Sequence, residues 1–261
     1  MPSVDVDGCA IHYTQAGENP DAPAVVFLGG LGFGAWGWSW QYGALAGPCR
    51  VVVIDTRGAG RSDAPDGPYA MADLVGDLEA VLADCNIRTA HLVGCGLGGA
   101  VALAAARRTN RAESLTLIGT PPSGEAFDPE PLSADPTDES ALRASTMSLL
   151  STAFCEREDA PIEQIIEWRR EEDATPAARE AQLAALDGFD PEPLYELTLP
   201  VRVVAGGADP VVDPEACRRL AEELPNGEFT SYPEASHLVT IERSAALNDV
   251  LLGFIESVDD R

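Results

Sequence analysis

Short apolar runs alternate with amphipathic stretches along most of the chain. Five runs bounded by turn residues are typical of buried strands: Ala24–Leu28, Val51–Ile54, His91–Val93, Leu115–Ile118 and Val201–Ala205. Between them, Ala72–Cys85 and Leu97–Arg108 carry apolar residues at helical spacing. Strands that alternate with helices predict an α/β fold with a mostly parallel central sheet and helices on both faces.

Two further segments precede this alternation. Val4–Asp7 and Ala10–Ala16 flank a turn at Gly8, and we expect them to form an antiparallel lead-in to the sheet.

The alternation stops after Thr120 and resumes after Pro200. The residues between are rich in proline loops and contain three segments with helical spacing: Ser140–Phe154, Ile162–Glu171 and Pro176–Leu186. We therefore expect a core built from residues 1–120 and 200–261, and an inserted helical cap formed by residues 121–199.

The charge of the chain is strongly one-sided. Every cation is arginine, and 17 of them face 43 aspartates and glutamates, which gives a formal net charge of −26 over 261 residues. Such a field repels nucleic-acid phosphates and anionic lipid surfaces. Nucleic acid and membranes are thus excluded as partners, and a small-molecule substrate or ligand remains.

The cysteines and the N-terminal segment limit the class further. The six cysteines are scattered, with no C-x-x-C pair and no neighbouring histidine, so we expect free buried thiols and no metal site. No nucleotide or flavin motif implies a cofactor. Met1–Gly8 lacks a basic start and an apolar core, and no apolar run could span a bilayer, which predicts a cytoplasmic protein.

One segment carries the strongest chemical signal. His91–Ala100, with the sequence HLVGCGLGGA, is a strand that runs through glycines into a helix, as in the G-x-S-x-G nucleophile elbow. Together with Asp55–Asp63, Gly206–Pro210 and Ser236–Leu238, in the order elbow, acid, histidine, it resembles the α/β-hydrolase superfamily. The chain is most similar in character to 3-oxoadipate enol-lactone hydrolases and related esterases. The resemblance implies the α/β-hydrolase fold with a helical cap in place of the insertion.

The register of the elbow decides what stands at the nucleophile position. The sharp turn needs small residues two before and two after its centre, and Gly94 and Gly98 place that centre at Gly96. Glycine has no oxygen to attack a carbonyl, so the family's acyl-enzyme mechanism lacks its nucleophile here. Centring the turn on Cys95 would put bulky residues at the small positions. A Cys95 thiolate nucleophile is therefore the less favoured alternative, as is a plain strand-to-helix turn.

The resemblance also implies an oxyanion hole made of two backbone donors. The Gly29-Gly30-Leu31 segment matches the loop whose N–H, at Leu31, forms one half, and Leu97 after the nucleophile position supplies the other. Backbone donors do not depend on the side chain at position 96. A pocket for a polarised carbonyl oxygen is thus expected even without a nucleophile.

The acid and the base are assigned in the same way. His237 matches the family's catalytic base, and Asp209 matches the acid that orients it, with Asp213 as the nearest rival. His91 opens the elbow strand and His12 lies in the lead-in, and both are expected to be structural.

The remaining site candidates are less specific. Gly30, Cys95, Trp36 and Trp168 are possible pocket residues, although both tryptophans could equally anchor helices. The charged loop Asp55–Asp63 is interpreted as a structural brace.

Three functions fit these observations. The first is an enzyme in which the His237–Asp209 dyad acts as a general base on a small carbonyl compound, while Leu31 and Leu97 bind the oxyanion. The second is a non-catalytic ligand-binding pseudo-hydrolase. The third is an inactivated variant of a serine esterase. The retained dyad favours the first, because a pure binder needs neither residue.

The charge yields a prediction about salt. The acidic excess without lysine indicates a protein adapted to high salt, whereas codon bias toward arginine would not explain the missing positive charge. We expect the urea midpoint of unfolding and any activity to rise from low to multimolar KCl, as self-repulsion is screened. Loss of folding at high salt would contradict this interpretation.

Overall fold

The computed structural model describes residues 2–17 and 19–260; Met1, Glu18 and Arg261, which fall within the predicted core, lie outside the described residues. These residues build an eight-stranded sheet in the order β1-β2-β4-β3-β5-β6-β7-β8. The strands are β1 Ser3–Val6, β2 Cys9–Ala16, β3 Ala24–Leu28, β4 Arg50–Ile54, β5 Ala90–Cys95, β6 Ala112–Ile118, β7 Val201–Gly206 and β8 Gly227–Tyr232. β2 pairs antiparallel with β1 and with β4, and the other pairs are parallel. The predicted α/β class with a mostly parallel sheet is confirmed.

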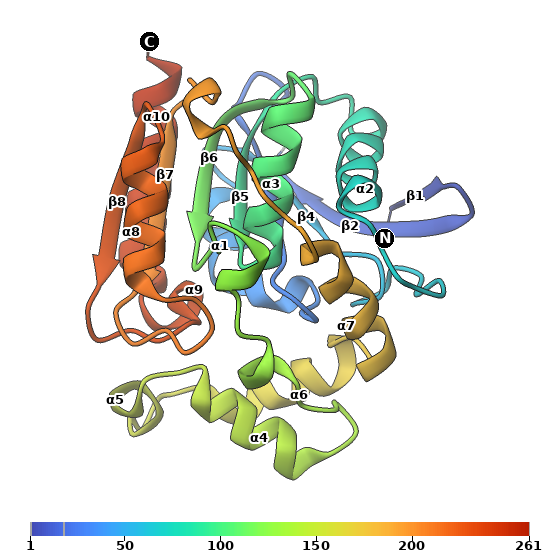
Figure 1. Ribbon diagram of the computed structural model, residues 1–261, viewed down its shortest axis with the longest axis vertical. Coiled ribbons are helices and arrows are strands. Elements are labelled where there is room, and N and C mark those ends of the chain that lie inside the picture. Colours follow the sequence, from blue (N-terminus) through green and yellow to red (C-terminus); the bar gives the residue numbers. More distant parts are fainter. Residues whose placement is uncertain (1, 18, 261) are drawn as a thin grey trace.

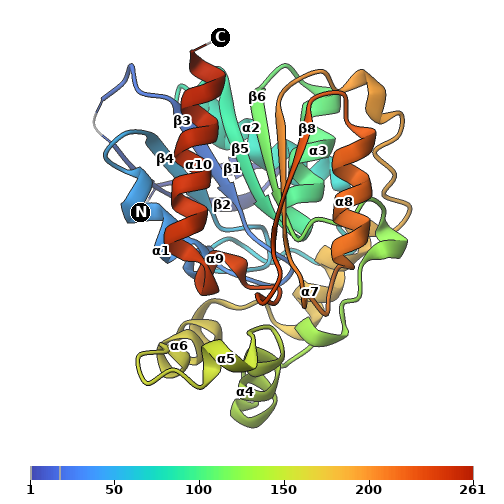
Figure 2. The ribbon, with the colours of Figure 1, turned by 90° about the vertical axis from the view of Figure 1, so that its left-hand side faces the viewer.

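Helices cover both faces of this sheet (Figures 1 and 2). The α-helices of the described chain are α1 Ser39–Leu45, α2 Met71–Asp84, α3 Leu97–Arg108, α4 Glu139–Ser148, α5 Thr152–Cys155, α6 Ile162–Glu172, α7 Pro176–Leu183, α8 Pro214–Glu223, α9 Val239–Glu242 and α10 Ser244–Asp259. Helices α1 and α10 lie on one face, and α2, α3 and α8 on the other. No helix in residues 2–17 and 19–260 has the length and apolar character needed to cross a membrane.

The strands are buried on both faces, which explains their continuous apolar runs. In β3, Val26 and Leu28 pack toward α2 and α3, whereas Val25 and Phe27 pack toward α1 and α10. Alternate side chains of a strand point to opposite faces, so a strand covered on both sides needs apolar residues at every position. All five residues of β3 are accordingly buried.

The inserted segment differs in detail from the predicted helices. The helix expected over Ser140–Phe154 is wrong: it is divided into α4 and α5. The interruption has two causes: the Ser151 side chain caps α5 by accepting the Phe154 N–H, and the Leu149 carbonyl turns away to accept the Leu238 N–H. Helices α4 to α6 lie beyond the carboxyl edge of the sheet, and α7 returns the chain toward the core (Figure 1).

The close approach of α3 to the sheet requires glycine at two positions. A Cβ on Gly98 would stand less than 3.0 Å from the Leu28 carbonyl oxygen, and a Cβ on Gly94 less than 3.0 Å from the carbonyl group of Gly98. Both obstacles are backbone atoms, which cannot rotate away. These are the two positions that the sequence pattern singles out around Gly96.

This packing predicts opposite effects for two helical glycines. Gly98→Ala should destabilise the protein by about 1–3 kcal/mol or more, because the new methyl group overlaps the β3 backbone. Gly253→Ala is the matched control: Gly253 is an exposed position of α10 with open space around it, so alanine should stabilise by about 0.5–1 kcal/mol. Denaturant unfolding of both variants provides the test, and equal effects would contradict the close approach.

Candidate active site

The carboxyl ends of four parallel strands bring together the predicted site residues. Leu31 follows β3, Gly96 follows β5, Asp209 follows β7 and His237 follows β8. In parallel sheets these ends meet at one edge, where ligands bind. The strand order therefore brings together motifs that are far apart in the sequence.

His237 and Asp209 form a buried pair. His237 Nδ1 lies 2.9 Å from Asp209 Oδ2 and 3.0 Å from Oδ1, and each side chain is 1% exposed. Asp209 Oδ1 also accepts the N–H groups of Val211 and Val212, at 2.8 and 3.1 Å. The carboxylate is thus held by its own loop and orients the ring, with Nδ1 turned to Asp209 and Nε2 facing the elbow.

The elbow places residue 96 opposite that free nitrogen. Gly96 has φ +51° and ψ −114°, and α3 begins at the next residue. An ideal Cβ at position 96 would lie 3.9 Å from His237 Nε2 and 3.6 Å from Phe127 Cε2. Any side chain there would point at the imidazole. Glycine adopts this φ without strain and leaves the position without a reactive atom.

Gly119 is a site residue that the motifs did not indicate. It has φ +49°, and a Cβ there would lie 3.0 Å from Asp209 Oδ2 and 3.3 Å from His237 Nδ1. Its backbone therefore packs against the dyad so closely that a side chain there would have to displace Asp209 or His237. The only signal in the sequence is a glycine directly after the apolar run Leu115–Ile118.

The predicted oxyanion donors lie on either side of the elbow. The Gly30 loop follows β3 beside the end of β5, since a Cβ on Gly30 would lie 3.8 Å from the Cys95 carbonyl oxygen. Among the residues described, no acceptor is found for the Leu31 or the Leu97 N–H. Both donors are therefore available for a carbonyl oxygen.

Gln182 of α7 holds the loop after β3 in place. Its Oε1 accepts the Gly32 N–H at 2.8 Å, and its Nε2 donates to the Arg57 carbonyl at 2.7 Å. The side chain is fully buried. This amide of the inserted segment hydrogen-bonds to backbone groups of two separate core loops, and so it fixes the loop next to Leu31. Sequence reasoning missed it, because a glutamine within an amphipathic helix looks like a surface residue.

The inserted segment also contacts the histidine loop. Glu242 Oε1 accepts the Ser236 N–H at 2.7 Å and the Ser151 N–H at 3.1 Å, and Ser151 Oγ donates to Oε2. The Leu238 N–H donates to the Leu149 carbonyl. His237 is thus flanked by two links from its loop to the insertion: Leu238 bonds directly to Leu149, and Ser236 is joined to Ser151 through Glu242.

A buried ion pair at the end of α6 is hydrogen-bonded to the loop after β3. Arg169 Nε donates to Asp173 Oδ2 at 2.8 Å, and the Trp36 indole donates to Asp173 Oδ1 at 2.8 Å. Burial raises the pKa of Asp173 to about 6, although Arg169 and the indole act in the opposite direction. The pair is oriented by hydrogen bonds, as a buried carboxylate requires.

Cys95 does not face the dyad. Its side chain packs with Val93 among the residues of the α1 and α10 face. Burial raises the pKa of the Cys95 thiol to about 12, and the charge of Asp209 adds to the shift. The thiolate, which is the nucleophilic form, is therefore strongly disfavoured.

The two candidate pocket tryptophans lie apart from the dyad. Trp36 and Trp168 line a cavity of about 220 Å³ together with Asp55, Arg61 and Glu172, and neither His237 nor Gly96 is among its lining residues. A larger cavity of about 710 Å³ lies between α3 and the segment after α7, again without the dyad. The dyad and the elbow are themselves buried.

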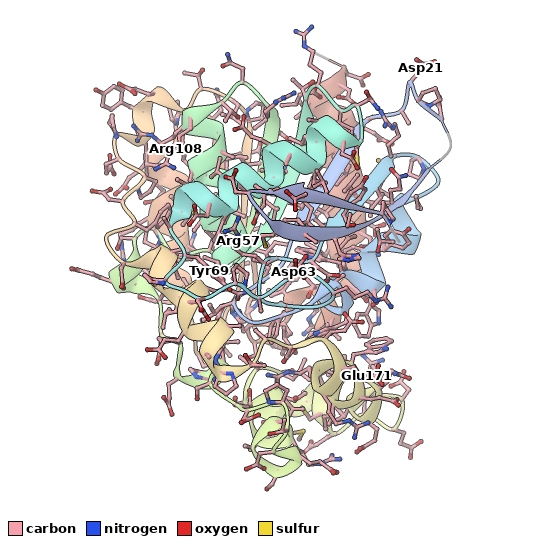
Figure 3. All side chains as sticks on the ribbon, turned by 90° about the vertical axis from the view of Figure 1, so that its right-hand side faces the viewer. Asp21, Arg57, Asp63, Tyr69, Arg108 and Glu171 are labelled. Carbon is pink, nitrogen blue, oxygen red and sulfur yellow. The ribbon has the colours of Figure 1, made fainter. Side chains whose placement is uncertain are left out.

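The charged loop after β4 acts as a brace, as its interpretation requires. Arg57 forms a two-fold hydrogen bond with Asp77 of α2, at 2.6 and 2.7 Å, and lies over the Tyr69 ring. Asp63 Oδ2 accepts the Ala10 N–H from β2. Figure 3 labels Arg57, Asp63 and Tyr69 in this loop region.

The other weighed residues lie outside the site. Asp213 caps α8 by accepting the Glu215 N–H, so it is not the partner of His237. His12 lies in β2, where its backbone N–H donates to Ser62 Oγ. His91 lies at the opposite, amino edge of the parallel strands.

Residues 25–250 match the sequence profile of the alpha/beta hydrolase family. The chain belongs to the alpha/beta hydrolase family. The chain is 31% identical to a protein of Variovorax paradoxus named as the carbamate hydrolase RutD, over 95% of this chain and 97% of that protein. It is 28% identical to 3-oxoadipate enol-lactonase 1 of Acinetobacter baylyi, over 91% of this chain and 90% of that protein. The crystal structure of the enol-lactonase from Burkholderia xenovorans matches this structure with a TM-score of 0.86 and 28% sequence identity. The match covers 98% of this chain and 100% of that one. The resemblance to enol-lactone hydrolases is confirmed.

The contrast between two cysteines yields a prediction. At pH 8 the Cys95 thiolate should make up only about one part in 10⁴, because its pKa is about 12, whereas Cys155 is partly exposed. In the folded hydrolase, iodoacetamide should modify Cys155 at least about 100-fold faster than Cys95. Peptide mass spectrometry after timed labelling measures both rates, and the difference should disappear in denaturant. Preferential modification of native Cys95 would contradict its burial.

Proposed function

We propose that this hydrolase uses the His237–Asp209 dyad as a general base that activates water, without a covalent acyl-enzyme, on a small ester, lactone or carbamate. One observation carries the proposal: position 96 points at His237 Nε2 from 3.9 Å but holds no side-chain oxygen. The space that a serine hydroxyl would fill is next to a correctly oriented base. A water molecule is the simplest nucleophile that fits there.

The reaction can be written from these groups. The N–H groups of Leu31 and Leu97 polarise the substrate carbonyl. Water attacks the carbonyl carbon while His237 Nε2 takes its proton, which gives a tetrahedral oxyanion. The intermediate then collapses, and the same proton passes from Nε2 to the departing oxygen or nitrogen. Asp209 holds the ring throughout by its bond to Nδ1.

The substrate class rests on the relatives. A protein named as a carbamate hydrolase and one named as an enol-lactonase match nearly the whole length of this chain. Carbamates, lactones and esters share a carbonyl carbon attached to a leaving oxygen or nitrogen, so one oxyanion site serves all three. Phe127 beside position 96 favours an apolar group next to that carbonyl.

Loss of the base should abolish hydrolysis. We expect His237→Gln and Asp209→Asn each to lower any turnover of γ-lactone, carbamate or aryl ester substrates by about 10²–10⁴-fold. His12→Asn is the control, because that histidine lies outside the site and should change activity little. Activity that survives His237→Gln in a folded protein would contradict the proposal and favour a ligand-binding role.

Restoring the missing oxygen tests the geometry. Gly96→Ser should place a hydroxyl within hydrogen-bond reach of His237 Nε2, so hydrolysis of p-nitrophenyl esters should become faster than the slow water-mediated turnover expected of the natural chain. The gain should be partial, since a non-glycine residue at φ +51° costs about 1–3 kcal/mol.

A fluorophosphonate probe measures the outcome directly. It should label residue 96 of Gly96→Ser but neither the natural chain nor Gly96→Ala, as located by peptide mass spectrometry. If a folded Gly96→Ser variant neither labels nor hydrolyses any ester, the base and the oxyanion donors do not work together, and the general-base mechanism fails with them.

A further inference from the structure

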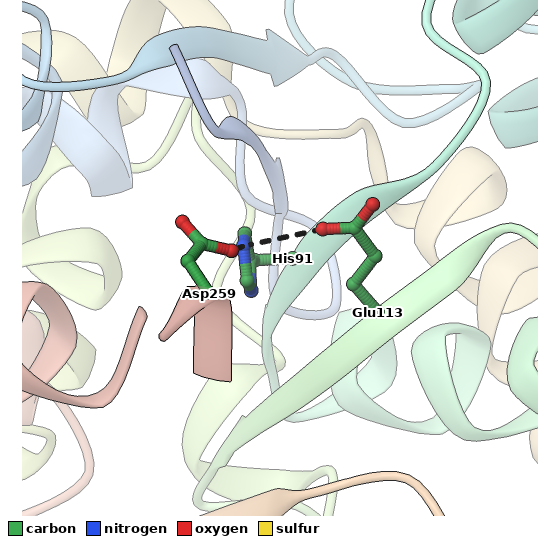
Figure 4. A group of neighbouring side chains, drawn as sticks. All are labelled: His91, Glu113 and Asp259. Atoms are coloured by element: carbon green, nitrogen blue, oxygen red, sulfur yellow. Dashed lines mark hydrogen bonds and ion pairs between the residues drawn. The ribbon is translucent and has the colours of Figure 1, made fainter. Parts of the chain in front are cut away.

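Three metal-ligating side chains meet at the edge of the sheet opposite the dyad (Figure 4). His91 is the second residue of β5, Glu113 the second residue of β6, and Asp259 the last residue of α10. His91 Nε2 lies 3.2 Å from Asp259 Oδ1 and 3.5 Å from Glu113 Oε2. One ligand atom from each residue lies within 4.8 Å of the others. These residues are far apart in the sequence, and neighbouring parallel strands bring two of them together.

The imidazole is held as a ligand would be. His91 is 1% exposed, whereas the two carboxylates are 39% and 37% exposed. Its Nδ1 hydrogen-bonds to the buried hydroxyl of Ser114 at 2.8 Å. An outer hydrogen bond to one ring nitrogen orients metal-binding histidines so that the other nitrogen faces the ion. Here the other nitrogen, Nε2, is directed outward between two carboxylates.

The negative charge of the two carboxylates favours binding of a cation. Within the described part of the chain, Glu113 and Asp259 form ion pairs only with His91, and no arginine lies within ion-pair distance of either. With a neutral imidazole the cluster carries two negative charges in a protein whose net charge is already −26. A single N–H at Nε2 can donate a well-aligned hydrogen bond to only one of the two carboxylates, whereas a divalent ion can bind both.

The distances fit a particular class of ion. Metal–ligand bonds near 2.0 Å with tetrahedral angles separate neighbouring ligand atoms by about 3.3 Å, and the two separations from Nε2 are 3.2 and 3.5 Å. One imidazole nitrogen and two carboxylate oxygens suit Zn²⁺, Co²⁺ or Mn²⁺ better than Ca²⁺ or Mg²⁺, which prefer oxygen alone. The exposed side of the cluster leaves room for water as a further ligand.

We propose that His91, Glu113 and Asp259 form a binding site for a divalent transition-metal ion, with Zn²⁺ as its representative. The ion would join β5, β6 and the C-terminal end of α10 at the amino edge of the sheet. This departs from the sequence expectation of no metal site, which considered only short spacings between cysteine and histidine. The site is separate from the dyad, so it stands or falls independently of the proposed function.

The test is Zn²⁺ retention after dialysis. The full-length protein is stripped with EDTA, loaded with Zn²⁺ in millimolar Mg²⁺ to saturate non-specific carboxylates, dialysed, and assayed by atomic emission. The natural chain should retain one equivalent. Glu113→Gln and Asp259→Asn, both partly exposed and isosteric, should lower the affinity at least about tenfold. Glu158→Gln, an exposed carboxylate elsewhere, is the matched control and should retain the full equivalent.

A second measurement identifies the ligand nitrogen. In ¹H–¹⁵N spectra of the histidine rings, Zn²⁺ should shift the resonances of His91 and leave those of His12 and His237 unchanged. The melting temperature of the natural chain, but not of Asp259→Asn, should rise with Zn²⁺. Retention of no zinc, equal retention by all four proteins, or shifts at His237 alone would overturn the proposal. The first of these results would leave the three residues as a hydrogen-bonded cluster without an ion.

Discussion

The architecture of the candidate site depends on the close approach of α3 to the backbone of β3. That approach exists only because Gly98 and Gly94 lack side chains where the Leu28 carbonyl and the first turn of α3 meet. It forces the chain between them into a positive φ at Gly96, and it sets the direction in which any side chain at that position would point. The elbow geometry is therefore a property of packing between helix and sheet. It persists in this chain although the residue at its centre carries no functional group.

The remaining parts of the site are positioned by hydrogen bonds from the insertion. Gln182 fixes the loop beside Leu31, and the Leu149 carbonyl fixes the loop beside His237. The buried Arg169–Asp173 pair, with the Trp36 indole, holds α6 against the loop that follows the oxyanion segment. Each contact satisfies groups that would be costly to bury alone. The site is thus assembled jointly by core and insertion.

The sequence predicted the elements that have a simple period and left out those that depend on long-range contacts. The bounds of β3 and α3 match the prediction, since an apolar run and a helical spacing of apolar residues are local signals. The break between α4 and α5 could not be seen, because it depends on Leu149 meeting Leu238, nearly 90 positions away. Motifs indicated the elbow, the acid and the histidine. Gly119 and Gln182 carry no motif, and only the folded chain shows that each lies against a site residue.

The two contacts between the insertion and the site loops have a consequence for ligand entry. His237 is almost fully buried, so under the proposed function a ligand would reach Nε2 only if the insertion moved aside. Such movement would break the bonds to Leu238 and Gly32, which neighbour His237 and Leu31. An open form would therefore lack ordered loops beside His237 and Leu31, and closure over a ligand would align them again. Under the proposed function, discrimination among ligands would then occur at closure, before any bond is broken.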